Sequence, residues 1–204
     1  MRTAKIPLPT IPRLSLYYRA LLGSNNSDFI SSEEIAKLAG VTAAGVRKDL
    51  AYFGQFGSPS KGYQITTLKQ SIIRILGTDK EWSVALVGVG NLGSALLAYK
   101  GFLKHGFKIS SAFDSDLRKI GKTLEGVRVL DISELEDEIK NKRIDMAIVT
   151  VPQDEAVEAI NKLVKAGIRA ILNFAPVRPQ AAKGVEILNI DLAIELEKLA
   201  YFLS

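Results

Sequence analysis

The chain has 204 residues, of which 47% are hydrophobic and 24% charged, and its formal net charge is +5. This length suffices for one or two domains with apolar cores, and the lack of cysteine excludes disulfides, thiolate metal sites and cysteine nucleophiles. No apolar run reaches the roughly 20 residues that a transmembrane helix needs, and residues 1–14 lack the apolar core of a signal peptide. We therefore expect a cytoplasmic protein that does not contact a membrane.

The positive charge is confined to the first part of the chain. Residues 1–78 hold ten Lys and Arg against four Asp and Glu, whereas residues 79–204 hold seventeen against eighteen. A basic segment joined to a near-neutral one indicates a polyanionic partner for the first segment. A solvated basic surface is the alternative.

Residues 1–78 have the pattern of a small helical domain. Apolar residues at helical spacing predict a first helix over residues 14–22. Ser31 and Glu34 have the spacing of a capping box, which begins a short second helix that ends near Gly40.

A third helix follows after a turn of only a few residues. Thr42 can cap this helix over residues 43–53, and the Gly-, Ser- and Pro-rich residues 54–65 predict a hairpin. A fourth helix, residues 67–76, ends at a glycine. Two helices with a short turn between them, followed by a hairpin, predict a winged helix-turn-helix domain.

The second helix of a helix-turn-helix enters the major groove of DNA with its N-terminal part at the base edges. Adjacent Arg47 and Lys48 point in different directions, so one can meet a base edge and the other a phosphate. The predicted DNA-binding residues come from this helix and the wing: Ala43, Gly45, Arg47, Lys48, Tyr52, Phe53, Lys61 and Tyr63. The alternatives are a solvated face for the two cations, core packing for Tyr52 and Phe53, and a protein-interaction module instead of a DNA-binding one.

From Trp82 onward, short strands alternate with helices. The β-rich runs are residues 82–88, 107–114, 127–130, 144–151, 168–172 and 185–188, and the helical segments are residues 92–104, 133–140 and 154–167. This alternation predicts a parallel sheet covered by helices on both faces. We therefore expect an α/β protein in which residues 79–188 form a Rossmann-type doubly wound domain.

Gly88, Gly90 and Gly93 form a G-x-G-x-x-G turn between a predicted strand and a predicted helix, and Asp114 ends the next strand. In a dinucleotide site these glycines permit a tight turn, phosphate approach and helix packing, and the carboxylate accepts hydrogen bonds from ribose hydroxyls. A carboxylate there repels a 2′-phosphate, which favours NAD(H) over NADP(H), although Arg118 lies near it in sequence. A purely structural glycine turn is the alternative.

Two later segments, residues 150–153 and 173–179, fall at the carboxyl ends of predicted strands, where the ligands of such sheets bind. We expect nicotinamide-side contacts there, with ordinary strand ends as the alternative. The predicted cofactor-binding residues come from the glycine turn, the aspartate and these two segments: Gly88, Val89, Gly90, Asn91, Leu92, Gly93, Asp114, Thr150, Val151, Pro152, Asn173, Phe174, Ala175 and Pro176.

Side chains for catalysis are scarce. His105 is the only histidine and ends a predicted helix, and the acidic residues of 133–140 have the pattern of a solvated helix face. Neither forms a catalytic set or a metal cluster, and residues 79–204 are about enough for a nucleotide domain and one terminal helix. We therefore expect a nucleotide receptor without catalytic residues or a metal, with a small NAD-dependent oxidoreductase that has a basic oligomerisation module as the alternative.

Four segments together resemble the Rex family of redox-sensing transcriptional repressors: residues 46–57, 88–96, 113–116 and 171–177 (VRKDLAYFGQFG, GVGNLGSAL, FDSD and ILNFAPV). The resemblance runs nearly end to end. It implies a homodimer on inverted-repeat operator DNA, from which NADH releases the protein while NAD+ competes for the same site. The wing departs from the R-G-V-G-Y that the family often has, because Pro59 and Ser60 precede Lys61.

The last residues are apolar on more than one helical face. Leu192, Leu196, Leu199 and Leu203 form one stripe, so this helix needs a partner to cover it. The resemblance implies that residues 189–204 are a dimerisation helix exchanged between subunits.

A relay between the two domains is a further expectation. Arg19 on the first helix, Tyr99 after the glycine turn and Asp191 before the last helix are its candidate residues. Three unconnected polar residues at the surface are the alternative.

Overall fold

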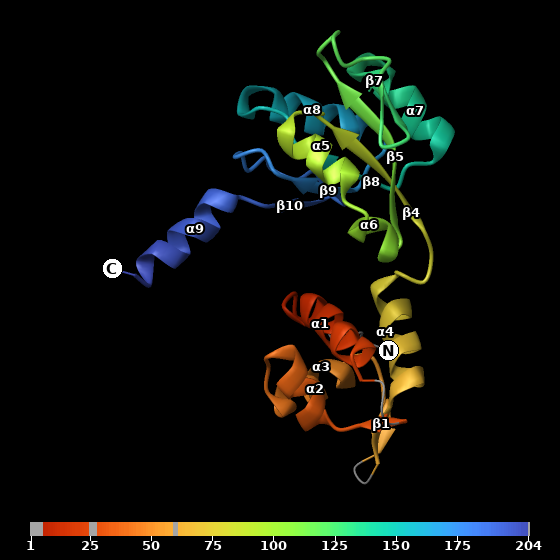
Figure 1. Ribbon diagram of the computed structural model, residues 1–204, viewed down its shortest axis with the longest axis vertical. Coiled ribbons are helices and arrows are strands. Elements are labelled where there is room, and N and C mark those ends of the chain that lie inside the picture. The colour runs from red at the N-terminus through yellow and green to blue at the C-terminus, as the bar shows by residue number, and fades with distance from the viewer. Residues whose placement is uncertain (1–5, 25–27, 59–60, 204) are drawn as a thin grey trace. The chain divides into compact units, whose positions relative to one another are not determined.

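The computed structural model describes residues 6–24, 28–58 and 61–203. It divides into two compact units, Met1–Lys80 and Glu81–Ser204 (Figure 1). Within the described residues, no helix is both long and apolar enough to cross a membrane.

The first unit combines helices with a small antiparallel sheet. Its helices are α1 (Thr10–Leu22), α2 (Ser32–Ala39), α3 (Ala43–Ala51) and α4 (Ile65–Leu76). Its strands β1 (Phe29–Ile30), β3 (Gly62–Gln64) and β2 (Gly57–Ser58) pair in that order. The helix-turn-helix α2–α3 and the hairpin β2–β3 confirm the predicted winged-helix fold. Pro59 and Ser60, where the wing departs from the family pattern, lie outside the described residues.

Side-chain caps define the turn between α2 and α3. Ser31 Oγ accepts the Glu34 N–H, and the Glu34 carboxylate accepts the Ser31 N–H at 2.8 Å, which completes the predicted capping box. Gly40 ends α2 with a φ of +68°, a conformation that favours glycine. Thr42 Oγ1 then accepts the Gly45 N–H at 3.1 Å, so α3 begins at a fixed place.

A buried carboxylate ties α3 to α1. Asp49 is 2% exposed and accepts two hydrogen bonds from the Arg13 guanidinium, at 2.6 and 2.7 Å. Tyr17 Oη and Thr10 Oγ1 also donate to it, at 2.6 and 3.0 Å. Burial raises the pKa of Asp49, but the hydrogen bonds from Arg13, Tyr17 and Thr10 outweigh it, so the pKa lies below its ordinary value. The ionised carboxylate therefore fixes the two helices against each other.

The second unit is built on one large sheet. Its strands are β4 (Trp82–Val87), β5 (Phe107–Asp114), β6 (Thr123–Leu124), β7 (Val127–Asp131), β8 (Met146–Val149), β9 (Ala170–Asn173) and β10 (Glu186–Asn189). They lie in the order β10-β9-β8-β4-β5-β7-β6, all parallel except the β6–β7 pair. Without β6, this is the 3-2-1-4-5-6 order of dinucleotide-binding sheets, which confirms the predicted fold class.

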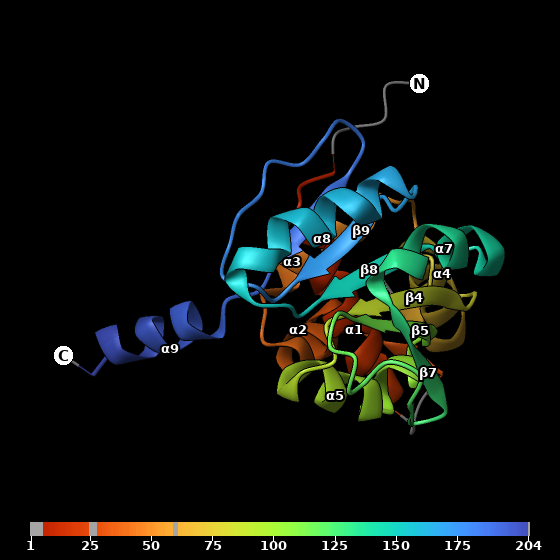
Figure 2. The ribbon, with the colours of Figure 1, turned by 90° about the horizontal axis from the view of Figure 1, so that it is seen from above.

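Helices cover both faces of this sheet (Figure 2). They are α5 (Asn91–Ala98), α6 (Gly101–Lys104), the 3-10 turn Ile132–Glu134, α7 (Leu135–Lys142) and α8 (Gln153–Lys165). The last helix, α9 (Leu192–Tyr201), extends away from the sheet and has no buried residue. One core cluster joins the sheet to α7 and α8 through residues such as Ile139 and Leu163. Another joins the opposite face to α5 and α6 through Leu96 and Phe102. The sheet is therefore doubly wound, as predicted.

The predicted helix over residues 92–104 is interrupted. Tyr99 leaves the helical conformation with a ψ of 98°, and its ring packs edge-on against Phe102 with centroids 5.1 Å apart. A side chain at Gly101 would overlap the Tyr99 ring. The break between α5 and α6 thus depends on aromatic packing over a glycine, which helical spacing does not predict.

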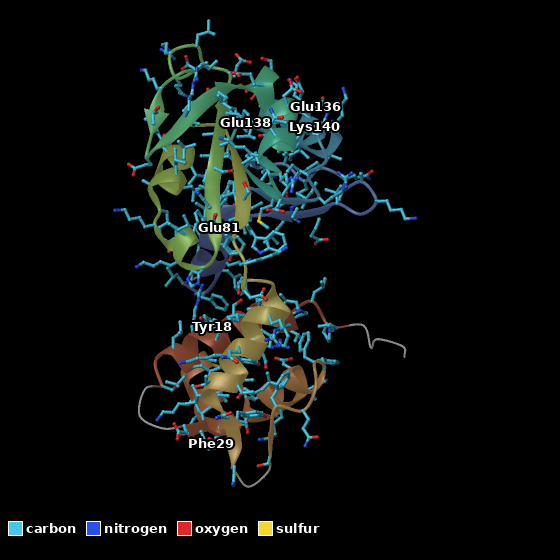
Figure 3. The ribbon with its side chains drawn as sticks, turned by 90° about the vertical axis from the view of Figure 1, so that its right-hand side faces the viewer. Tyr18, Phe29, Glu81, Glu136, Glu138 and Lys140 are labelled. Atoms are coloured by element: carbon cyan, nitrogen blue, oxygen red, sulfur yellow. The ribbon has the colours of Figure 1, made fainter. Side chains whose placement is uncertain are left out.

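The acidic run on α7 is only partly a solvated face. Glu136 pairs with Lys140 at 2.9 Å on the exposed side (Figure 3). Glu138 instead faces the sheet, where it accepts the Ser111 hydroxyl at 2.8 Å and pairs with Lys142 at 2.7 Å. The prediction that Glu138 is solvated is wrong, because a polar Ser111 on β5 gives the carboxylate a buried partner.

Replacing Asp49 by Asn should destabilise the first unit by about 3 kcal/mol, because Arg13 loses its carboxylate partner. Since the pKa of Asp49 is lowered by folding, its contribution is complete above about pH 4 and is lost as the pH falls through the folded value. The measurement is hydrogen exchange of α1 and α3 in the whole protein at neutral and acidic pH. The exposed Asp28→Asn is the matched control, and equal protection in both variants would contradict the assigned role of Asp49.

Candidate functional site

The glycine turn forms where β4 ends. Gly88 has a φ of +93°, which favours glycine, and its N–H donates to the Phe113 carbonyl at 2.8 Å. A side chain at Gly88 would come within 2.9 Å of the Thr150 backbone. The turn is therefore held tightly between β5 and the end of β8.

Gly93 lets α5 pack against this turn. A side chain there would overlap the Gly88 carbonyl oxygen and lie 2.9 Å from Thr150 Oγ1. Thr150 Oγ1 donates to that same carbonyl at 2.7 Å. Gly90, which caps α5, is different, because a side chain there would meet no atom within 4 Å. The N-terminus of α5 thus faces open space beside the turn.

Asp114, at the end of β5, braces the turn from the other side. Its Oδ2 accepts the Val89 N–H at 2.7 Å and Lys119 Nζ at 2.9 Å, and its Oδ1 accepts the Asp116 N–H at 2.8 Å. Burial raises the pKa of Asp114, but these hydrogen bonds outweigh it and bring the pKa below its ordinary value. The carboxylate is therefore ionised at neutral pH.

A cavity of about 710 Å³ opens between these groups, at the carboxyl ends of β4 and β8. Its size is typical of small-molecule sites, and its place is the switch point at which doubly wound sheets bind ligands. Its lining residues come from the turn, the loop after β5 and the start of α8: Val87, Gly88, Gly90, Asp114, Ser115, Asp116, Lys119, Ile132, Thr150, Val151, Pro152, Glu155, Glu158, Ala159 and Lys162.

The cavity brings together part of the predicted cofactor site. The predicted residues that line it are Gly88, Gly90, Asp114, Thr150, Val151 and Pro152. Other predicted residues are not among those that line it: Val89, Asn91, Leu92, Gly93, Asn173, Phe174, Ala175 and Pro176. Lys119, Glu158 and Lys162 line the cavity but were not predicted. Glu158 and Lys162 have the i,i+4 spacing of a helical ion pair, whereas no pattern in the sequence indicates Lys119.

Asn173 shapes its loop from inside. Its side chain is fully buried, and its amide donates to the carbonyls of Ala175 and Val177 and to Asn189 Oδ1, at 2.9 to 3.1 Å. Its own Oδ1 accepts the Ala175 N–H at 3.0 Å. These four hydrogen bonds fix the conformation of the loop after β9 and its distance from β10.

A second groove, of about 710 Å³, lies in the first unit between the start of α2, the end of α3 and the wing. Three of the predicted DNA-binding residues line it: Arg47, Lys61 and Tyr63. Arg47 Nη1 donates to Ser32 Oγ at 2.7 Å and to Glu33 Oε1 at 3.0 Å. The remaining donors of the guanidinium have no partner that the described residues supply.

The other predicted DNA-binding residues lie along α3 and just beyond it. Ala43 and Gly45 are in its first turn, and Lys48 is exposed in its last turn. Phe53 packs against the core of the first unit, as does Tyr63, while Tyr52 is half-buried. The core-packing alternative therefore holds for Phe53.

The three relay candidates lie on or at the ends of three different helices. Arg19 is exposed on α1 in the first unit, and Tyr99 is 59% exposed in the second. Asp191 caps α9, accepting the N–H groups of Ala193 and Ile194 at 3.0 and 3.4 Å. Within the described part of the second unit, no hydrogen bond or ion pair joins Tyr99 to Asp191.

Helix α9 carries an uncovered apolar surface. None of its residues is buried in the described chain. Most of its large apolar side chains are more than half exposed, namely Leu192 58%, Leu196 67%, Leu199 61% and Tyr201 77%, while Ile194 is half-buried. The stripe predicted from the sequence is present and lacks cover from its own unit.

No metal site emerges from the described residues, which hold no group of three His, Cys, Asp or Glu placed to bind an ion. His105 ends α6, outside the residues that line the cavity.

Two family models match the chain, one in each unit. Residues 5–51 match a family described as putative DNA-binding protein N-terminus, and residues 79–177 match one described as CoA binding domain. These matches agree with the division of the chain at about residue 80.

Curated relatives match over the whole length. The redox-sensing transcriptional repressor Rex of Syntrophobacter fumaroxidans is 47% identical over 207 residues, which cover 100% of this chain and 99% of that protein. The protein of the same name from Desulfitobacterium hafniense is 49% identical, with 98% of this chain and 97% of the relative covered.

Solved structures of one repressor also match. RSP in complex with β-NAD+ and operator DNA has a TM-score of 0.93 and 37% identity over 98% of this chain and 93% of its own. RSP in complex with β-NADH has a TM-score of 0.86 and 36% identity, with 98% and 95% covered.

Gly93→Ala should lower the stability of the second unit by about 1–3 kcal/mol, because the added methyl group overlaps backbone that cannot rotate away. Gly90→Ala, in contrast, should leave it within about 0.5 kcal/mol, because its methyl group enters open space. Urea unfolding followed by the fluorescence of Trp82 on β4 measures both. Equal midpoints for the two variants would contradict the close packing at Gly93.

Proposed function

This chain belongs to the Rex family of redox-sensing transcriptional repressors, and on that premise we propose that NADH releases it from operator DNA. In this proposal residues 1–78 bind the DNA, residues 79–188 bind NAD(H), and residues 189–204 form a helix exchanged across a homodimer. The observation that carries it is the cavity at the ends of β4 and β8, which a glycine turn, a helix N-terminus and Asp114 surround.

The nucleotide is sensed and not consumed. Family members are named as transcriptional repressors, which are not enzymes, so the expected absence of enzymatic activity is confirmed and the oxidoreductase alternative is wrong. RSP binds both β-NAD+ and β-NADH. In this chain the pyrophosphate would lie at the N-terminus of α5 beside Gly90, and the adenosine ribose would lie near Asp114.

The discrimination between the two redox states follows from charge. The reduced nicotinamide ring is uncharged and can enter an apolar, closed pocket, whereas the oxidised ring is cationic and loses more hydration there. In this proposal the closed pocket belongs to the conformation that does not bind DNA, and NADH therefore favours that conformation. A ligand shifts this equilibrium only by its difference in affinity for the two conformations.

The DNA-binding surface is α3 with the wing. Arg47 and Lys48 are exposed on α3, and Lys61 is exposed in the turn just before β3. Their charges suit the phosphates and guanine edges of a major groove. RSP was solved with operator DNA, which supports the same partner for this chain.

The homodimer accounts for the surface of α9. A second copy would cover the stripe of leucines that is more than half exposed, as a terminal helix with so much apolar surface requires. An inverted-repeat operator then matches the two-fold symmetry of the protein. Such a regulator works in the cytoplasm and needs neither a metal nor a membrane.

The first test measures binding to a labelled duplex that carries a TTGTGA-type inverted repeat. NADH should abolish binding and NAD+ should spare it. Arg47→Ala should weaken operator binding about 10- to 100-fold, as the loss of one base-reading arginine implies. The control Lys37→Ala, an exposed lysine on α2, removes the same charge and should weaken it less. Binding that neither nucleotide affects would overturn the proposal.

The relay is tested at Asp191. Asp191→Asn retains a cap for α9 but removes the charge. NADH affinity should stay within about threefold, while the NADH needed to release DNA should rise at least about tenfold, because coupling and not binding is lost. Asp191→Ala also removes the cap. If only the Ala variant differs from the wild type, Asp191 acts through the helix cap and has no place in the relay.

A further inference from the structure

The ribose end of the cavity does not present a free carboxylate. An ionised carboxylate offers about four acceptor positions, and Asp114 fills three of them with Val89 N–H, Asp116 N–H and Lys119 Nζ. Its side chain is only 8% exposed. A ribose at this end therefore meets a carboxylate that protein donors already hold.

Lys119 is the cation at this end of the cavity. Its Nζ lies 2.9 Å from Asp114, its side chain is 36% exposed, and it lines the cavity. Arg118, which is nearer to Asp114 in sequence, is 88% exposed, bonds to Asp116 and is not among the lining residues. Lys119, and not Arg118, therefore supplies the positive charge at the ribose end of the cavity.

An ion pair and a lone carboxylate treat a 2′-phosphate differently. A lone carboxylate repels it, whereas the ammonium group of a 2.9 Å pair cancels most of that repulsion. An ammonium has three N–H donors, and Asp114 takes one from Lys119. The other two can be donated to a phosphate, which lysine binds as a point charge.

Resting on the proposed NAD(H) site, we propose that Lys119 sets the discrimination between NAD(H) and NADP(H). Its ammonium group lowers the penalty that Asp114 imposes on a 2′-phosphate. NADPH is therefore a second, weaker ligand of the same cavity, and the strength of this sensor's response depends on both reduced nucleotides.

A purely structural Lys119 would behave differently. Through Asp114 the lysine also supports the Val89 N–H in the glycine turn. Loss of that support would weaken NADH and NADPH binding by the same factor. The ratio of their dissociation constants therefore separates specificity from support.

The test measures NADH and NADPH binding to the full-length protein by nucleotide fluorescence. Lys119→Met keeps the length of the side chain but removes its charge, and Lys119→Arg keeps the charge. Lys162→Met is the matched control, because Lys162 also lines the cavity but pairs with Glu158 at 2.8 Å. We expect Lys119→Met to weaken NADPH at least about tenfold, the loss of one charge-assisted contact, and NADH at most about threefold.

Lys119→Arg and Lys162→Met should keep the wild-type ratio of the two dissociation constants. Equal weakening of both nucleotides by Lys119→Met, or no NADPH binding by the wild type, would overturn the inference. If Lys119→Met does not fold, the wild type still decides, because about tenfold more salt should weaken NADPH more than NADH and an unchanged ratio would reject the role of Lys119. A wild type that binds neither nucleotide would instead reject the proposed NAD(H) site.

Discussion

The close approach of α5 to the glycine turn is the constraint on which the nucleotide half of the protein depends. No side chain fits at Gly93, because the Gly88 carbonyl oxygen occupies its space, and Thr150 holds that oxygen in place through its hydroxyl. One hydrogen bond thus connects the ends of β4 and β8 at the place where α5 packs against the turn. Since strands on either side of this point have crossovers to opposite faces of the sheet, the cavity opens at this point. The position of the cavity is therefore a consequence of topology and of one missing side chain.

Each unit also relies on one buried carboxylate that several donors satisfy. Asp49 joins α3 to α1, and Asp114 joins β5 to the glycine turn. In both cases burial alone would raise the pKa of the carboxyl group, but the hydrogen-bond donors lower the pKa below its ordinary value. Helix α3 and the glycine turn are therefore anchored by charged groups. Nearby donors offset the cost of removing these groups from water. Such anchors keep α3 and the turn in place while the surrounding surface stays free for ligands.

The sequence predicts what local backbone rules control. The spacing of Gly88, Gly90 and Gly93 indicates the turn because each glycine meets a steric need within a few residues, and the caps at Ser31 and Thr42 indicate where helices begin for the same reason. The family resemblance to Rex rests on such segments. Most of the fold could be predicted from features of this kind, and the glycine turn locates one side of the cavity.

Contacts between distant segments are what the sequence does not reveal. Nothing in the spacing shows that Asn173 meets Asn189 on the neighbouring strand, or that Glu138 of α7 meets Ser111 of β5. The same holds for Arg47, whose guanidinium meets Ser32 and Glu33 of the neighbouring helix. These pairs form only once the helices have packed, and side-chain type alone does not determine them.

A sensor of this kind needs surfaces that its own unit leaves incomplete. Helix α9 keeps its leucines uncovered, and the guanidinium of Arg47 uses only one of its nitrogens for Ser32 and Glu33. The uncovered leucines are costly for an isolated chain, because their apolar surface stays in water, whereas the remaining donors of Arg47 can bind water. A partner with an apolar surface can cover the leucines, and a DNA duplex offers phosphates to the guanidinium. Because a ligand changes the balance between two conformations only through its difference in affinity for them, incomplete surfaces of this kind are where a small nucleotide can alter binding to a much larger partner.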